Sequence, residues 1–184
     1  PNVLSISYGE KGFSTLNNAV PDIRVRADSS GDIGTEGLWY IDPVTGAIQS
    51  GTSGLTGRGV IVGVIDSGID IEHPSFRTGA FPAYESRILR LWDPGLQPRT
   101  SEGEHGPDAS LLSVSHTYGV EYTKEDIDRF LNGPDTCPHR DTYGHGTHMT
   151  GIAAGNGNPG ESIESGRPDG RFNFVGVAPE ADIV

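Results

Sequence analysis

One run of apolar residues constrains the fold of this 184-residue chain more than any other feature. The stretch "GVIVGVIDSGID", residues 59–70, is rich in valine and isoleucine and contains an Asp-Ser-Gly triplet. Such a near-continuous apolar run is typical of a strand buried on both faces, as in a parallel sheet flanked by helices. The sequence therefore predicts an α/β fold with Asp66 at the carboxyl end of a central strand, where catalytic groups collect. A turn or capping role for Asp66 is the alternative, because Asp-Ser-Gly also favours turns.

Other segments carry local signals for strands, helices and loops. Alternating apolar residues predict strands, while Thr123 followed by Asp126 predicts a capping box at the start of a helix. Gly155 is placed to end a second helix made of small residues. The expected elements are strands at 3–9, 87–93 and the end of 172–184, helices at 123–131 and 144–155, and loop at 37–54, 94–116 and 156–171.

Composition excludes several classes of function. The formal net charge is −12, with 25 acidic and 13 basic residues, so the field of the chain repels phosphate backbones and no nucleic-acid partner is expected. The longest apolar run, Val60 to Ile65, is broken by Gly63 and is too short to span a membrane. Cys137 is the only cysteine, which excludes an internal disulfide.

The stretch "DTYGHGTHMTG", residues 141–151, places His145 at the start of the second helix. A neutral imidazole suits general-base chemistry when a carboxylate holds its other nitrogen. Two alternatives stay open from the residues alone: a capping or buried histidine, and a metal site shared with His148. The metal site is the weaker, because no acidic third ligand follows on the same helical face.

Three segments in a fixed order resemble the motifs of the subtilisin-like serine proteases. They are "VIVGVIDSGIDIEHPSF", "DTYGHGTHMTGIAAG" and "VGVAPEADIV". The resemblance implies a three-layer α/β fold with a mainly parallel sheet, of which only the N-terminal half is expected here. It assigns the catalytic aspartate and histidine to Asp66 and His145, with Ser67 donating a hydrogen bond to Asp66. His148 is then a buried structural residue and not a ligand.

The same resemblance implies a serine endopeptidase that acts on protein or peptide substrates without a cofactor. The family places its nucleophile in a Gly-Thr-Ser motif after the histidine, and its oxyanion asparagine downstream as well. Ser53 lies in "SGTSG" but precedes Asp66, whereas the triad order is Asp, His, Ser, so Ser53 is interpreted as a linker serine. The fragment is expected to be inactive alone. A pseudoprotease with a binding or regulatory role is the alternative function.

A finer resemblance is to a bacterial branch that includes the spore-germination proteases. It rests on "RILRLWDPG" and "YGVEYTKEDIDRFL", although Pro94 replaces the branch's usual glutamine. The separation of Asp66 and His145, 145 − 66 = 79 residues, leaves room for an insertion at about 94–141. We expect this insertion to be a surface excursion near the site and not part of the sheet core.

The resemblance also suggests the domain organisation and the setting. Residues 1–20 are expected to be a prodomain tail or N-terminal extension, and 21–184 a partial catalytic domain whose partners include its own prodomain. A secreted or cell-surface bacterial protein is expected. No metal site is predicted, because Ser75 stands where classical subtilisins have a calcium-binding aspartate, and the acidic loop containing Glu161, Glu164 and Asp169 is interpreted as solvated.

Overall fold

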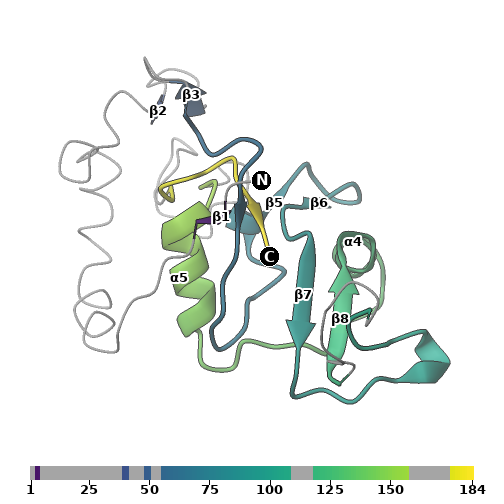
Figure 1. The fold of residues 1–184 in the computed structure, drawn as a ribbon. Coiled ribbons are helices and arrows are strands. Elements are labelled where there is room, and N and C mark those ends of the chain that lie inside the picture. Colours follow the sequence, from purple (N-terminus) through teal and green to yellow (C-terminus); the bar gives the residue numbers. More distant parts are fainter. Residues whose placement is uncertain (1–2, 5–38, 42–47, 51–54, 109–117, 158–174) are drawn as a thin grey trace.

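The computed structural model describes residues 3–4, 39–41, 48–50, 55–108, 118–157 and 175–184 (Figure 1). Its main sheet has the order β1 (Val3–Leu4), β4 (Ile61–Val62) and β9 (Asp182–Ile183), and both neighbouring pairs are parallel. The pairing continues past β4, where the amide of Val64 donates to the carbonyl of Val184 at 2.8 Å. The central, parallel strand predicted from the apolar run is confirmed.

The strand predicted for residues 87–93 exists, but it serves two sheets. Its first part borders β9, since Ile88 forms a parallel bridge with Ile183. Its second part, β7 (Arg90–Asp93), pairs antiparallel with β8 (Val120–Thr123). Two more antiparallel pairs are small: β2 (Trp39–Ile41) with β3 (Ile48–Ser50), and β5 (Arg77–Thr78) with β6 (Glu85–Ser86). Among the described strands, parallel pairing is therefore confined to the main sheet and the bridge beside it.

The expectation of loop throughout residues 37–54 is wrong for β2 and β3. Trp39 pairs with Ser50, and Ile41 pairs with Ile48. Tryptophan, tyrosine and isoleucine favour strands, whereas Pro43 and the neighbouring glycines dominated the loop prediction. Some predictions fall outside the described residues: those for Ser53, for the acidic loop with Glu161, Glu164 and Asp169, and for most of residues 1–20.

Both predicted helices are present. Helix α4 (Lys124–Asn132) begins with the expected capping box, in which Thr123 Oγ1 accepts from the Asp126 amide at 3.3 Å and Asp126 Oδ2 accepts from the Thr123 amide at 3.0 Å. Helix α5 (His145–Ala154) ends at Gly155, as predicted. Two 3₁₀ turns, η1 (Pro74–Phe76) and η2 (Thr100–Glu102), complete the described helical elements. None of the described helices is long and apolar enough to cross a membrane.

A hydrophobic core joins the elements within residues 55–108, 118–157 and 175–184. Figure 1 shows α5 on one side of the main sheet and β7, β8 and α4 on the other. The buried apolar side chains come from both sides and from the sheet, and they include Val62, Ile69, Ile71, Phe76, Ile88, Val120, Tyr122, Ile127, Leu131, Cys137, Ala153, Ala154, Ala181 and Ile183.

The segment 94–141, which was predicted to be an insertion, corrects another expectation. Its described residues lie outside the main sheet, as predicted, and residues 94–108 are largely exposed or half-buried. Its second part is not a surface excursion, because Val120 and Ile127 are fully buried in the shared core. The alternation of buried and half-buried residues along β8 gives this short strand a core-facing side, which the polar composition of the whole segment concealed.

Arg87 ties three elements together inside this core. Its guanidinium donates to the carbonyls of Ser75 at 3.1 Å, Ala154 at 2.6 Å, and Ala181. These carbonyls belong to η1, to the end of α5 and to the residue before β9. Burial lowers the pKa of Arg87 to about 10, against the opposing effect of Asp182 and Glu180, so the side chain stays charged at neutral pH. These hydrogen bonds offset the cost of burying the guanidinium charge, and a carbonyl that lost its donor there would destabilise the fold.

We therefore predict that Arg87→Met lowers the free energy of unfolding by about 3 kcal/mol, because the carbonyls lose their donor. Arg90→Met is the matched control, since the Arg90 side chain is 49% exposed and only forms a 3.4 Å ion pair with Glu121. That exposed pair is worth less than about 1 kcal/mol. Urea denaturation of the purified proteins measures both losses, and equal losses would contradict the assigned role of Arg87.

Candidate active site

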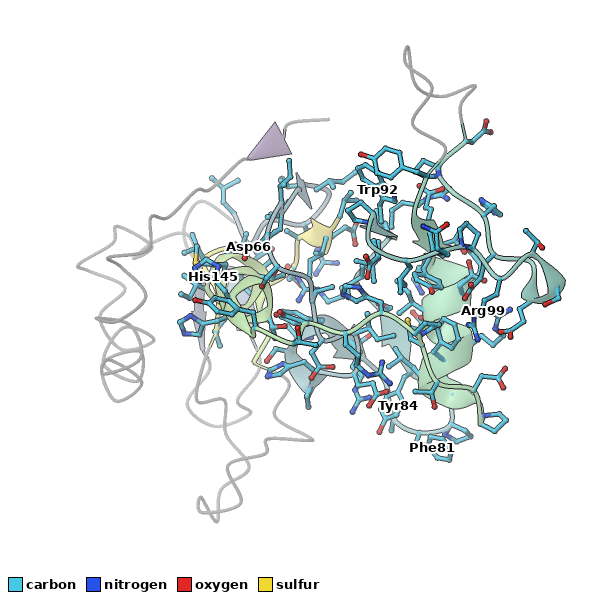
Figure 2. All side chains as sticks on the ribbon, turned by 90° about the horizontal axis from the view of Figure 1, so that it is seen from below. Asp66, Phe81, Tyr84, Trp92, Arg99 and His145 are labelled. Carbon is cyan, nitrogen blue, oxygen red and sulfur yellow. The ribbon has the colours of Figure 1, made fainter. Side chains whose placement is uncertain are left out.

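The structure brings together Asp66 and His145, which are 79 residues apart in the sequence. Asp66 follows β4, and His145 is the first residue of α5. The imidazole Nδ1 lies 2.6 Å from Asp66 Oδ1, and the two side chains are 18% (Asp66) and 17% (His145) exposed. Figure 2, which looks along α5, shows the two labelled residues side by side and away from Phe81, Tyr84 and Arg99. The two residues that the resemblance assigned therefore lie within hydrogen-bond distance of each other.

Two glycines make this approach possible. A Cβ on Gly146 would lie 2.0 Å from the carbonyl oxygen of Gly68 and 3.1 Å from the Cβ of Asp66. Gly68 itself has a φ of +132°, a backbone conformation that residues with a side chain rarely adopt. The first turn of α5 therefore rests directly on the backbone of the loop that follows Asp66. We call residues 66–70 the aspartate loop.

Ser67 holds this loop in two ways. Its backbone amide donates to Asp66 Oδ1 at 2.7 Å, so the predicted hydrogen bond to Asp66 is present but comes from the backbone. Its hydroxyl donates instead to Asp141 Oδ1 at 2.9 Å and accepts from the Gly146 amide at 3.0 Å. Ser67 thus links the loop to the start of α5 without using its side chain on Asp66.

Asp141 is a site residue that sequence reasoning missed. Its carboxylate accepts from the Gly144 amide at 2.8 Å and from the amide and hydroxyl of Thr147 at 2.9 and 2.6 Å. A carboxylate at this position caps exposed amides at the positive end of a helix. Its place three residues before the start of the helix predicted at 144–155 was the available signal.

The electrostatics of Asp141 follow from these contacts. Burial would raise the pKa of its carboxyl, but the hydrogen bonds from Thr147, Gly144 and Ser67 outweigh this effect and lower the pKa to about 2. Asp141 is therefore ionised throughout the neutral range. Its fixed charge holds the first turn of α5, which carries His145, against the aspartate loop.

His148 departs from the expectation of a buried residue, because it is only half-buried. Burial is the largest influence on its pKa, followed by the nearby His145, and both lower it.

Among the residues that the structure describes, no group of three histidine, cysteine, aspartate or glutamate side chains is arranged to hold a metal ion. The Tyr143 ring, 68% exposed, lies 6.3 Å from the His145 ring.

The arrangement of Asp66 and His145 is suited to proton transfer. An ionised carboxylate accepts from Nδ1–H, which fixes the imidazole tautomer and leaves Nε2 as the nitrogen that can take a proton. The same carboxylate stabilises the imidazolium that forms when it does. Such a pair activates a hydroxyl or thiol nucleophile that comes within hydrogen-bond reach of Nε2.

Comparison with known proteins identifies relatives of the region that contains Asp66 and His145. The family model described as "Subtilase family" matches residues 57–184. Subtilisin-like protease SBT2.1 of Arabidopsis thaliana is 34% identical over 146 residues, covering 74% of this chain and 16% of that protein. Subtilisin-like protease SBT3 of Solanum lycopersicum is 35% identical over 130 residues, covering 70% and 15%.

A bacterial relative is also similar. The PII-type proteinase of Lactococcus lactis subsp. cremoris is 29% identical over 128 residues, covering 70% of this chain and 6% of that protein. The chain thus spans well under a quarter of the length of each of these three relatives.

The glycine contact generates one prediction within a single helix. Gly146→Ala places a methyl group against the Gly68 carbonyl and is expected to lower the free energy of unfolding by about 3 kcal/mol or more. Gly151→Ala, also in α5, meets no atom within 4 Å and is expected to raise it by about 0.5–1 kcal/mol. Thermal denaturation compares them, and similar effects of both changes would refute the contact.

Asp141 generates a prediction about pH. Because its folded pKa of about 2 lies below its ordinary value of 3.8, its contribution to stability is present above about pH 4. The contribution is lost as the pH falls from about 4 to 2. Asp141→Asn should therefore give a flatter curve of unfolding free energy against pH in this window than the unmodified protein. Parallel curves from denaturant titrations at each pH would contradict the assignment.

Proposed function

Because this chain belongs to the subtilase family, we propose that the complete protein is a serine endopeptidase in which Asp66 and His145 form two thirds of a catalytic triad. The observation that carries the proposal is the 2.6 Å contact between Asp66 Oδ1 and His145 Nδ1. The two residues are 79 positions apart, and each lies in a segment that matches the order of the family's motifs. The curated relatives that match are named as proteases or proteinases.

In the proposed mechanism, a serine hydroxyl attacks the scissile carbonyl while His145 Nε2 takes its proton. The imidazolium then gives that proton to the leaving amine, and an acyl-enzyme forms. A water molecule attacks the acyl carbon next, again losing a proton to His145, and the serine is regenerated as the acid departs. Asp66 holds the tautomer through Nδ1–H and stabilises the imidazolium in both steps.

The proposal assigns the nucleophile to a Gly-Thr-Ser motif that follows residue 184 in the complete protein, and not to Ser53. The triad order of the family, Asp, His, Ser, supports this assignment, because Ser53 precedes Asp66 in the chain. The oxyanion asparagine is assigned to the same later region. A three-layer arrangement is proposed for the complete domain, with its substrates being proteins or peptides and its prodomain a further partner.

The finer family assignment is also a proposal. The two branch motifs lie in β7 and in β8 with α4, and β7 and β8 pair side by side. This common substructure supports membership of the bacterial branch that includes the spore-germination proteases. A secreted or cell-surface location in a bacterium is part of the same proposal.

Two substitutions in the complete protein test the mechanism. Asp66→Asn should lower kcat for casein hydrolysis by about 10⁴-fold, because the base loses its tautomer. His145→Ala should lower it by about 10⁶-fold, because the base itself is removed. Glu72→Gln is the control, since Glu72 is an exposed carboxylate six residues beyond Asp66 and should leave kcat unchanged. Initial rates at saturating substrate provide the measurement.

Two outcomes would contradict the proposal. Retention of full activity after His145→Ala would remove the assigned base. Absence of any casein hydrolysis by the unmodified protein, together with lack of a serine nucleophile in its full sequence, would favour the pseudoprotease instead. The fold and the Asp66–His145 contact are independent of that outcome.

A further inference from the structure

A second aspartate–histidine pair lies beneath the aspartate loop. His139 Nδ1 is 2.6 Å from Asp93 Oδ2, the same separation as in the Asp66–His145 pair. The His139 side chain is only 5% exposed, whereas that of Asp93 is 20% exposed. Asp93 ends β7, and the segment with His139 leads from α4 to α5, so the pair joins two segments far apart in sequence. In Figure 1 this segment passes below the carboxyl end of β7 on its way to α5.

The hydrogen bonds of His139 determine its tautomer. Its Nε2 accepts from the backbone amide of Ile69 at 3.2 Å. A backbone amide is only a donor, so Nε2 carries no proton, and Nδ1–H must be the group that donates to Asp93. Asp93 is fixed in turn, because its Oδ1 accepts from the Gly95 amide at 2.9 Å. His139 is therefore a neutral ring with both nitrogens committed to one geometry.

This ring also supports the loop sterically. A Cβ on Gly68 would lie 2.9 Å from His139 Cε1 and 3.0 Å from Nε2. On its other side, Gly68 presents its carbonyl to Gly146 at the start of α5. Gly68 is thus enclosed between the buried imidazole and the helix that carries His145.

The aspartate loop has further attachments, but none replaces this one. The Ser67 hydroxyl bonds Asp141, and the Asp70 amide donates to Thr147 Oγ1 at 2.8 Å. Those contacts hold the loop to the segment around α5. His139 alone connects the described part of the loop to a side chain anchored on β7.

We propose that the Asp93–His139 pair is a positioning element, which fixes the aspartate loop so that Asp66 meets His145 Nδ1 at hydrogen-bond distance. His139 touches neither Asp66 nor the reacting nitrogen, and it acts through the backbone of Gly68 and Ile69. Its effect on turnover rests on the proposed function, whereas its effect on the Asp66–His145 contact does not. The insertion at 94–141 therefore contributes a support for the site as well as part of the core.

Three variants of the complete protein test this role. His139→Leu fills the buried position with an apolar side chain and removes both hydrogen bonds of His139. His139→Gln offers a carbonyl oxygen to the Ile69 amide and an NH₂ group to Asp93, so it is the conservative rescue. Cys137→Ala is the matched control, because Cys137 is buried in the hydrophobic core two residues away from His139.

We expect His139→Leu to lower kcat by at least about tenfold with KM within about threefold, because a small displacement of the carboxylate affects the chemical step more than binding. His139→Gln should restore kcat to within about threefold of the unmodified protein. Cys137→Ala should lower the melting temperature without changing kcat. Equal kcat for His139→Leu and Cys137→Ala would overturn the proposal.

A spectroscopic experiment tests the positioning role without measuring turnover. Proton NMR should show a low-field signal from the His145 Nδ1–H bonded to Asp66, assigned by its loss in His145→Ala. His139→Leu should shift or broaden this signal, while His139→Gln and Cys137→Ala should preserve it. An unchanged signal in folded His139→Leu would refute the positioning role. If the protein has no peptidase activity, the proposed function fails, and this signal still decides the inference.

The unmodified protein provides a last measurement, which does not depend on whether His139→Leu folds. Nitrogen-15 NMR of the imidazole should find His139 neutral at pH 7, with its proton on Nδ1, and the Ile69 amide should exchange slowly. A proton on Nε2, or a fast-exchanging Ile69 amide, would overturn the proposal.

Discussion

The contact between Gly68 and Gly146 is the constraint on which the rest of the site depends. It lets the first turn of α5 lie against the backbone that follows β4, closer than any side chain would permit. At this separation Asp66 Oδ1 lies 2.6 Å from His145 Nδ1. The main parallel sheet supplies the other half of the geometry, because only three residues separate its central strand β4 from the aspartate loop.

Aspartates with separate tasks surround this contact. Asp66 bonds His145, while Asp141 bonds the amides and hydroxyls that join α5 to Ser67. In the proposed arrangement Asp93 acts one step further away, through His139. Each of the three carboxylates accepts hydrogen bonds from its own set of donors. These donors stabilise the negative charge of each carboxylate separately. This division allows one carboxylate to serve chemistry while the others hold the backbone.

Much of this architecture was predictable from local sequence. The apolar run predicted β4, the capping residues predicted α4, and the ordered motifs placed Asp66 near His145. The missed features depend on contacts across the chain. The pairing of β2 with β3, the burial of Val120, and the switch of the Ser67 hydroxyl to Asp141 all require a partner that no local pattern specifies. A polar composition described the insertion on average and concealed its buried side.

A double-variant experiment tests the central claim that Asp66 and His145 act as one unit. The kcat for casein hydrolysis would be measured for the complete protein, for Asp66→Asn, for His145→Ala, and for the protein carrying both changes. If the carboxylate acts only through the imidazole, the double variant should lose no more activity than the more damaging single variant. Losses that multiply, so that the double variant falls by the product of the two factors, would show independent roles and contradict the account.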